Sequence, residues 1–253
     1  MNTQHWIFLS PHLDDVALSC GGLVWDLTQQ GHTLEIWSLM AGLPPDDEES
    51  PFAQEIHARW GVSGSEAILA RREEDRAACA VLGAAARHFD WPDAIYRRDE
   101  HTGLPIVNSD EELFSRSPEP AVVGEVAELL TQSLPAGAQV VLPMGLGGHV
   151  DHQAVVLAGE RVVQVTHAYA DYPYILNQFD HPHLTAGGWQ KDPHTLGEDA
   201  LGAWQEAVLR HKSQLSTFWR DEDETRLALR NYLAGGGGRL WIKSSIDRNP
   251  PHR

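Results

Sequence analysis

Three side chains that can ligate a metal or carry a proton follow the first apolar segment of the chain. His12, Asp14 and Asp15 come directly after residues 6–9, which are all apolar and predict a short buried strand. Open α/β sheets place their binding sites at the carboxyl ends of such strands. One imidazole and two carboxylates at this position therefore indicate a metal-binding or hydrolytic site.

A second cluster repeats this arrangement in the middle of the chain. His149, Asp151 and His152 follow the apolar segment 138–142 and the glycine-rich turn 143–148. Side chains three residues apart face the same side of a helix, so His149 and His152 are expected one turn apart at a helix start. Parallel strands of one sheet end at the same edge, and the two clusters are therefore expected to converge.

The six side chains together can build a hydrolytic metal centre. Two imidazoles and one carboxylate bind a metal and leave coordination positions for water and substrate. Zinc accepts such ligands, and a bound water whose pKa falls to about 7 is a nucleophile at neutral pH. The remaining carboxylate and imidazole are the groups that hydrolysis requires as general base and general acid.

A purely structural role would explain only part of the first cluster. Asp14 or Asp15 can cap the following helix, and His12 can be an ordinary loop residue. Capping accounts for one aspartate and leaves the second aspartate and the histidine unexplained. The second cluster, which also follows an apolar strand, favours the functional interpretation.

The elements that would position these residues alternate along the chain. Strands are predicted at 6–9, 33–40, 87–91, 138–142, 167–172 and 239–243. Helices are predicted at 15–30, 54–60, 66–82, 119–133, 201–218 and 222–234, and at 155–165 as a continuation of the second cluster. Gly21-Gly22 inside the first helix predicts a close approach to the sheet or to the site.

This order of elements predicts an α/β fold, a single Rossmann-like, doubly wound and mostly parallel sheet with helices on both faces. The 253 residues suffice for one large core. With neither an internal repeat nor a clear boundary in sight, we expect one α/β domain over residues 1–246. The polar, proline-bearing residues 247–253 predict a loose tail.

The composition argues against several classes of partner. The formal net charge of -17, from 19 Lys+Arg and 36 Asp+Glu, disfavours nucleic acid and anionic lipid as partners. The N-terminus lacks the pattern of a signal peptide, and no apolar run reaches the roughly 18 residues of a transmembrane helix. We therefore expect a cytoplasmic protein without stable membrane insertion, and the sequence is compatible with a homo-oligomer.

Two motifs make the chain recognisable, Pro11-His12-Leu13-Asp14-Asp15 and His149-Val150-Asp151-His152. Supporting matches are Arg71-Arg72-Glu73-Glu74 ahead of Val81-Leu82-Gly83, then Asp171-Tyr172-Pro173 and His211-Lys212-Ser213-Gln214. With these motifs the chain resembles the PIG-L/LmbE-like family of zinc-dependent N-acetylglucosaminyl de-N-acetylases. The resemblance extends from residue 7 to about residue 218.

The resemblance implies a role for each clustered side chain. The zinc ligands would be His12, Asp15 and His152, with other divalent transition metals as alternatives to zinc. Asp14 would be the base that takes a proton from the zinc-bound water. His149 would either polarise the amide carbonyl or protonate the leaving amine, and Asp151 would orient a histidine.

Two further residues match positions that contact substrate in similar proteins. Arg71 would contact a substrate hydroxyl or phosphate, although an ion pair with Glu74 or Asp75 on the helix surface would also explain it. Asp93 would bind a sugar hydroxyl, although an aspartate after Pro92 also suits a turn. Both alternatives stay open at the level of the sequence.

The chain departs from the usual family motif at two positions. Leu13 replaces the proline between the histidine and the paired aspartates, and Val16 replaces the glutamate that often follows them. Neither side chain would ligate the metal. The changes suggest a different substrate, whose specificity would depend on the acidic loop 42–53, the region of Trp60 and the irregular stretch 94–118.

The resemblance implies a metal-dependent hydrolase that removes an N-acetyl group from an N-acetylglucosamine-type conjugate by zinc-hydroxide attack on the amide. Its partner would be a small-molecule glycoside or glycoconjugate. One alternative is a zinc amidase that acts on a larger acyl or thiol-conjugate amide. Another is a non-catalytic sugar- or nucleotide-binding module, but no Gly-x-Gly-x-x-Gly follows the first strand.

Overall fold

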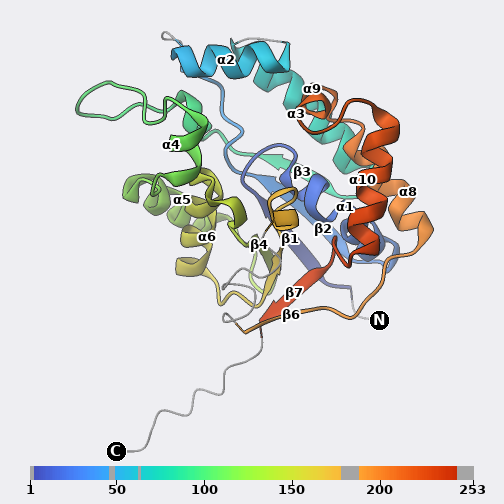
Figure 1. Ribbon diagram of the computed structural model, residues 1–253. Helices are drawn as coiled ribbons and strands as arrows, with labels where there is room; N and C mark the ends of the chain where they lie inside the picture. Colours follow the sequence, from blue (N-terminus) through green and yellow to red (C-terminus); the bar gives the residue numbers. More distant parts are fainter. Residues whose placement is uncertain (1–2, 46–48, 62–63, 178–187, 244–253) are drawn as a thin grey trace, which may run out of the picture.

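A seven-stranded sheet runs through the middle of the fold (Figure 1). The computed structural model describes residues 3–45, 49–61, 64–177 and 188–243. The strands are β1 (His5–Ser10), β2 (Thr33–Ser38), β3 (Ala85–His88), β4 (Gln139–Pro143), β5 (His167–Tyr169), β6 (Trp189–Lys191) and β7 (Leu240–Lys243). They lie in the order β3-β2-β1-β4-β5-β7-β6.

Five neighbouring strands, from β3 to β5, run parallel, whereas β7 pairs antiparallel with β5 and β6 pairs antiparallel with β7. The sheet is therefore mostly parallel, as the sequence predicts. Ser10 ends β1, and Pro143 at the end of β4 pairs with Tyr169 at the end of β5. The two motifs accordingly leave the sheet at the same edge.

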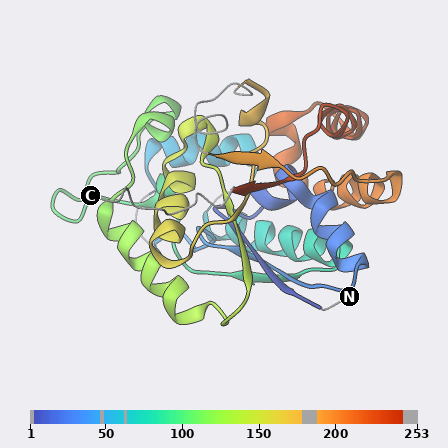
Figure 2. The same ribbon diagram turned by 90° about the horizontal axis from the view of Figure 1, so that it is seen from below.

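Helices cover both faces of the sheet (Figures 1 and 2). One layer contains α1 (Asp15–Gln29), α3 (Gly64–Leu82) and α8 (Glu198–Val208), with α10 (Glu222–Ala234) packed on α8; the other contains α5 (Pro120–Ser133) and α6 (Val150–Val162). Successive side chains of β1 point to opposite faces of the sheet, so Phe8 packs with α1 and α3 while Ile7 packs with α5 and α6. Three shorter helices are α2 (Pro51–Trp60), α4 (Asp110–Ser115) and α9 (Lys212–Phe218).

The glycine pair in α1 serves helix packing. A Cβ at Gly21 would lie 2.7 Å from a ring carbon of Trp204 in α8, and one at Gly22 would lie 3.1 Å from the same side chain. The indole nitrogen of Trp204 donates to the carbonyl of Ala17 in α1 at 2.6 Å. The predicted close approach is present, but its partner is α8 and neither the sheet nor the site.

The helix predicted at 201–218 is two helices. The backbone amides of Arg210 and His211 donate to carbonyls only three residues back, which tightens and ends α8. Glu74 of α3 then accepts hydrogen bonds from the backbone amide and the hydroxyl of Ser213, at 3.0 and 2.7 Å. The chain therefore turns at residues 209–211 before α9 begins.

Other boundaries also differ from the prediction. Helix α2 begins at Pro51, inside the predicted loop 42–53, because the Ser50 hydroxyl caps it by accepting from the amide of Ala53 at 3.0 Å. Strand β3 lies at Ala85–His88 and so precedes most of the predicted 87–91 segment. Two short elements, α4 and β6, were not predicted. The predicted tail 247–253 lies outside the described residues, and the single domain stays a prediction.

No helix within the described residues is long and apolar enough to cross a membrane.

Candidate metal centre and active site

The first motif forms a tight turn between β1 and α1. The Ser10 hydroxyl donates to the carbonyl of His12 at 2.6 Å and accepts from the amide of Val16 at 3.3 Å. Asp14 occupies the N-cap position of α1, but its side chain makes no capping hydrogen bond. The capping explanation of this aspartate is therefore wrong, and its carboxylate is available to the site.

His12, Asp15 and His152 place one ligand atom each within 4.8 Å of one another, and all three are buried. Nδ1 of His12 lies 3.2 Å from one oxygen of Asp15, and Nε2 of His152 lies 3.3 Å from the other. A tetrahedral ion with bonds of about 2.0–2.1 Å has ligand atoms about 3.3 Å apart. The three predicted ligands therefore have the spacing and chemistry of a metal site.

Each imidazole is held on its far side by a carboxylate. Nε2 of His12 lies 3.2 Å from Asp151, and Nδ1 of His152 lies 2.7 Å from Asp171. With these nitrogens donating to the carboxylates, the lone pairs of the opposite nitrogens face Asp15. Metal-binding histidines are commonly oriented in this way.

Arg97 and Asp171 also help to orient the two imidazoles, and neither was assigned a role from the sequence. Arg97 lies 2.7 Å from a carboxylate oxygen of Asp151 and also donates to Glu119 at 3.0 and 3.2 Å. Asp171 accepts from the amides of Met144 and Leu146 as well as from His152. The position of Asp171 after β5 was a usable signal, because it too follows a parallel strand. Arg97 lies in an irregular stretch and had none.

The carboxylates around the site stabilise positive charge within it. Burial alone would lower the pKa of His12, but Asp93, Asp15 and Asp151 raise it well above its usual value. Burial likewise opposes charge on His152, yet Asp15 and Asp171 raise its pKa to about 10. The raised pKa values show that the surrounding carboxylates give the site an excess of negative charge. A divalent cation bound there can balance this charge.

Asp14 and Arg71 form an ion pair in the lining of the cavity. Burial raises the pKa of Asp14, while the nearby Arg71 guanidinium lowers it only in part. Their closest atoms are 3.5 Å apart, and the guanidinium lies 4.6 Å from the ring centre of Trp60. Arg71 is only 5% exposed, so the alternative of a surface ion pair is wrong.

His149 lines the cavity and has its hydrogen-bond donor at Nε2. Its Nδ1 accepts a hydrogen bond from the backbone amide of Asp151 at 3.2 Å, which places the proton of the neutral ring on Nε2. Burial, reinforced by His12 and His152, holds the pKa of His149 well below its usual value. A neutral imidazole with a free N–H can donate to a carbonyl oxygen or to a leaving nitrogen.

Asp93 combines the two roles that the sequence left open. One oxygen accepts from the amide of Ile95 at 3.1 Å and caps a short 3-10 turn, and the other lies 3.5 Å from Nε2 of His12. Asp93 also lines the cavity beside the trio. The turn interpretation is therefore correct, and the carboxylate still faces the site.

A cavity of about 180 Å³ contains the predicted site residues. His12, Asp14, Asp15, Arg71, Asp93, His149 and His152 all line it, whereas Asp151 lies behind His12. Its rim includes Arg59 and Asp110, which form an ion pair at 3.3 Å. Two of the three regions predicted to determine specificity line this cavity, the Trp60 region and the stretch 94–118, which contains the unpredicted helix α4. No described residue of the loop 42–53 lines it.

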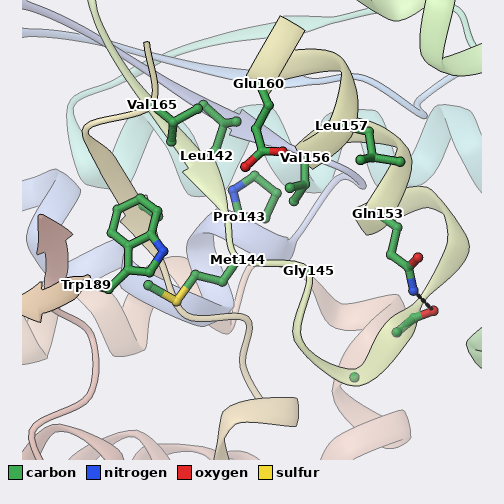
Figure 3. A pocket seen from close by; sticks show the side chains of 13 residues that line it. Leu142, Pro143, Met144, Gly145, Gln153, Val156, Leu157, Glu160, Val165 and Trp189 are labelled. Carbon is green, nitrogen blue, oxygen red and sulfur yellow. Dashed lines mark hydrogen bonds between the residues drawn. The ribbon is translucent and has the colours of Figure 1, made fainter. Parts of the chain in front are cut away.

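A larger cavity of about 520 Å³ lies beside the turn 143–148 and helix α6 (Figure 3). Its walls are mainly apolar and include Met144, Val156 and Trp189, with the carboxylate of Glu160 projecting toward Pro143. It contains no histidine or aspartate among its described lining residues. The smaller cavity is therefore the candidate active site, although the other cavity is larger.

A second trio, His12, His149 and Asp151, also has ligand atoms within 4.8 Å of one another. It is less suited to a metal ion. The Arg97 cation already compensates Asp151, and the Nδ1 lone pair of His149 accepts a backbone amide. The trio around Asp15 has no such competing cation on its carboxylate among the contacts described for it.

Comparisons with known proteins agree with this geometry. Residues 7–163 match the family model described as PIG-L, GlcNAc-PI de-N-acetylase. The 2'-N-acetylparomamine deacetylase of Niallia circulans is 27% identical over 239 residues, covering 88% of this chain and 85% of that protein. Two solved structures are similar over nearly the whole chain.

One is the zinc-inhibited form of a teicoplanin deacetylase, with 27% identity, a TM-score of 0.73 and coverage of 94% of this chain and 97% of that one. The other is the A40926 pseudoaglycone deacetylase, with 28% identity, a TM-score of 0.69 and coverage of 96% and 97%. The family model covers more than half of the chain and includes both motifs. The chain belongs to the PIG-L family of de-N-acetylases.

Proposed function

We propose that this hydrolytic deacetylase cleaves the N-acetyl amide of an N-acetylglucosamine-type conjugate, with Asp14 as the base and His149 as the hydrogen-bond donor. One water is consumed, and acetate and a free amine are released. The observation that carries the proposal is the position of these two groups in one cavity beside His12, Asp15 and His152.

The trio would hold a divalent transition metal, and zinc suits two imidazoles and one carboxylate. When bound, such an ion supplies Lewis acidity, which polarises the amide carbonyl and lowers the pKa of water. Asp151 and Asp171 keep the imidazoles in the orientation and tautomer that metal binding requires.

Asp14 is suited to accept the proton of the attacking water. Burial raises the pKa of Asp14, which makes its carboxylate a stronger base than that of an exposed aspartate. The Arg71 guanidinium 3.5 Å away helps to keep the carboxylate ionised. Nε2–H of His149 donates either to the amide oxygen, as negative charge develops there, or to the leaving nitrogen.

The substrate is a small glycoside or glycoconjugate. Its support is the similarity to deacetylases described as acting on 2'-N-acetylparomamine and in teicoplanin biosynthesis. Polar side chains beside the trio, Arg71 and Asp93 among them, can hydrogen-bond sugar hydroxyls. A cytoplasmic location and a homo-oligomeric state stay predictions from the sequence.

Equimolar release of acetate and amine tests the proposal. Zinc-loaded protein is incubated with a panel of N-acetylglucosaminides, including an N-acetylated aminoglycoside, and both products are quantified. Asp14→Asn should lose activity by about 100-fold or more, because general base catalysis contributes at least that much. The matched control is Asp199→Asn in the exposed first turn of α8, which should behave as wild type.

Two results would overturn the proposal. The first is the absence of acetate release from every member of the panel under metal-loaded conditions. The second is near wild-type turnover by a folded Asp14→Asn variant.

A further inference from the structure

Polar and aromatic side chains both line the candidate active-site cavity. Arg71 lies 3.5 Å from Asp14, and Gln214 and Thr217 also line the cavity. The aromatic rings of Phe114 and Tyr174 lie against His149 and His152 respectively. An N-acetyl sugar offers hydroxyls to polar side chains, and the methyl of its acyl group suits an apolar surface.

Phe114 and Tyr174 form a continuous aromatic wall beside the imidazoles of His149 and His152. The Phe114 ring meets His149 edge-on with centroids 5.3 Å apart, and the Tyr174 ring meets His152 edge-on at 5.8 Å. The two aromatic rings contact each other at 5.7 Å. An apolar group bound next to His149 would therefore meet Phe114.

The glycine-rich turn 146–148 leaves space for this wall. Gly147 and Gly148 have φ values of +84° and +82°, which favour glycine. A Cβ at Gly147 would lie 2.5 Å from the Tyr174 ring, and one at Gly148 would lie 2.7 Å from the carbonyl oxygen of Phe114. The turn thus admits both aromatic residues close to the imidazoles.

Helix α4 fixes the position of Phe114. The Ser109 hydroxyl caps the helix by accepting from the amide of Glu112, and the Glu112 carboxylate accepts from the amide of Asn108. Leu113 is buried in the cluster that contains Ile56 and Val150, so it anchors the helix. Phe114 itself remains 36% exposed and can be replaced without opening the core.

We propose that Phe114, supported by Tyr174, is a specificity-determining residue that limits the acyl group of the substrate to acetyl. The inference rests on the proposed deacetylase function. The methyl of the acetyl group would pack against the Phe114 ring, and a longer acyl chain would collide with it. One extra methylene in a fitted apolar pocket changes relative rates by roughly 10–200-fold.

The ratio of kcat/KM for N-butanoylglucosamine to kcat/KM for N-acetylglucosamine tests the inference. It is measured for zinc-loaded wild type, Phe114→Ala and Phe114→Leu. We expect the ratio to rise at least about 10-fold in Phe114→Ala and by a smaller factor in Phe114→Leu, whose side chain frees less space.

Phe218→Ala is the matched control. Phe218 lines the same cavity from α9, but its ring packs on Trp219 at 5.5 Å. Its truncation should leave the acyl ratio within about 2-fold of wild type.

The outcomes separate this inference from the proposed function. If folded Phe114→Ala and Phe114→Leu hydrolyse both amides with an unchanged ratio, Phe114 supports His149 without selecting the acyl group, and the inference is wrong. An equal rise in Phe218→Ala would also overturn it, because the effect would then be a general loosening of the cavity. If wild type hydrolyses no N-acyl amino sugar, the proposed function fails and the inference fails with it.

Discussion

Asp151 and Asp171 are buried carboxylates that orient the two imidazoles of the candidate metal site formed by His12, Asp15 and His152. Asp151 is in turn compensated by Arg97, which reaches it from the irregular stretch after β3. The orientation of His12 therefore depends on an ion pair that does not itself face the cavity. A side chain of this kind contributes through burial and pairing, and its removal leaves a charge unpaired.

Replacing Arg97 with methionine should destabilise the protein by roughly 3–5 kcal/mol, because Asp151 is fully buried and would lose its cation. The free energy of unfolding in urea measures the effect. Arg98→Met is the neighbouring control, since Arg98 is exposed, and it should change stability by less than about 0.5 kcal/mol. Equal effects of the two substitutions would contradict the assigned role of Arg97.

His211 predicts a pH dependence of stability outside the metal trio. Burial lowers its pKa to about 4, so the folded protein keeps the imidazole neutral while the unfolded chain protonates it near the usual value. Its stabilising contribution is present above about pH 6.5 and is lost as the pH falls toward 4. The loss from this one group is as much as about 3 kcal/mol.

Urea unfolding of wild type and His211→Leu at pH 7, 5.5 and 4.5 isolates this contribution. Both proteins should lose stability on acidification, because many groups titrate. The wild type should lose more, so the stability difference between the two proteins should shift in favour of the variant as the pH falls. A difference that is constant across the three pH values would show that His211 does not contribute in this way.

At the scale of the elements, close packing decides where glycine is required. Gly159 of α6 lies against β4, and a Cβ there would be 2.3 Å from a methyl of Leu142. A Cβ on Gly124 of α5 would meet no side chain or neighbouring element of the described residues within 4 Å. The two glycines lie in the same helical layer, but only Gly159 is in close contact with a neighbouring element.

Alanine at these two positions should have opposite effects. Gly124→Ala should stabilise by about 0.5–1 kcal/mol, because alanine favours the helix and meets no neighbour. Gly159→Ala should destabilise by roughly 1–3 kcal/mol, because the core around Leu142 must shift. Thermal unfolding of both variants measures the effects, and stabilisation by both would contradict the packing described for α6.

The sequence predicted the elements that carry the motifs better than those that form the cavity rim. Buried apolar segments followed by polar clusters identified β1 and β4, and they also indicated the helix starts near Asp15 and after His149. The break between α8 and α9 depends on Glu74 of a distant helix, which local patterns do not contain. The short helix α4 and the contact of Arg97 with Asp151 depend on tertiary packing in the same way.

The whole molecule brings distant segments to one edge of a parallel sheet. His12 follows β1, His152 follows β4 and Asp171 follows β5. Three neighbouring strands therefore position two of the candidate metal ligands and the carboxylate that orients His152. A metal ion bound there would link segments more than a hundred residues apart. Folding and metal binding are therefore expected to be coupled.

Metal removal should lower the stability of the whole protein. At a free zinc concentration 100-fold above the dissociation constant, a site absent from the unfolded chain stabilises by about 2.7 kcal/mol. The urea midpoint of chelator-treated wild type should rise with added zinc, whereas that of His152→Ala should respond much less. Equal responses of the two proteins would indicate that zinc acts elsewhere.

The metal content of three purified proteins tests the central claim most directly. Wild type, Asp14→Asn and His152→Ala are loaded with zinc, dialysed against metal-free buffer and analysed by elemental mass spectrometry. The assignment of His152 as a ligand and Asp14 as the base predicts about one metal per chain in wild type and Asp14→Asn, and a large loss in His152→Ala. Full metal content in folded His152→Ala, or none in wild type, would contradict the account.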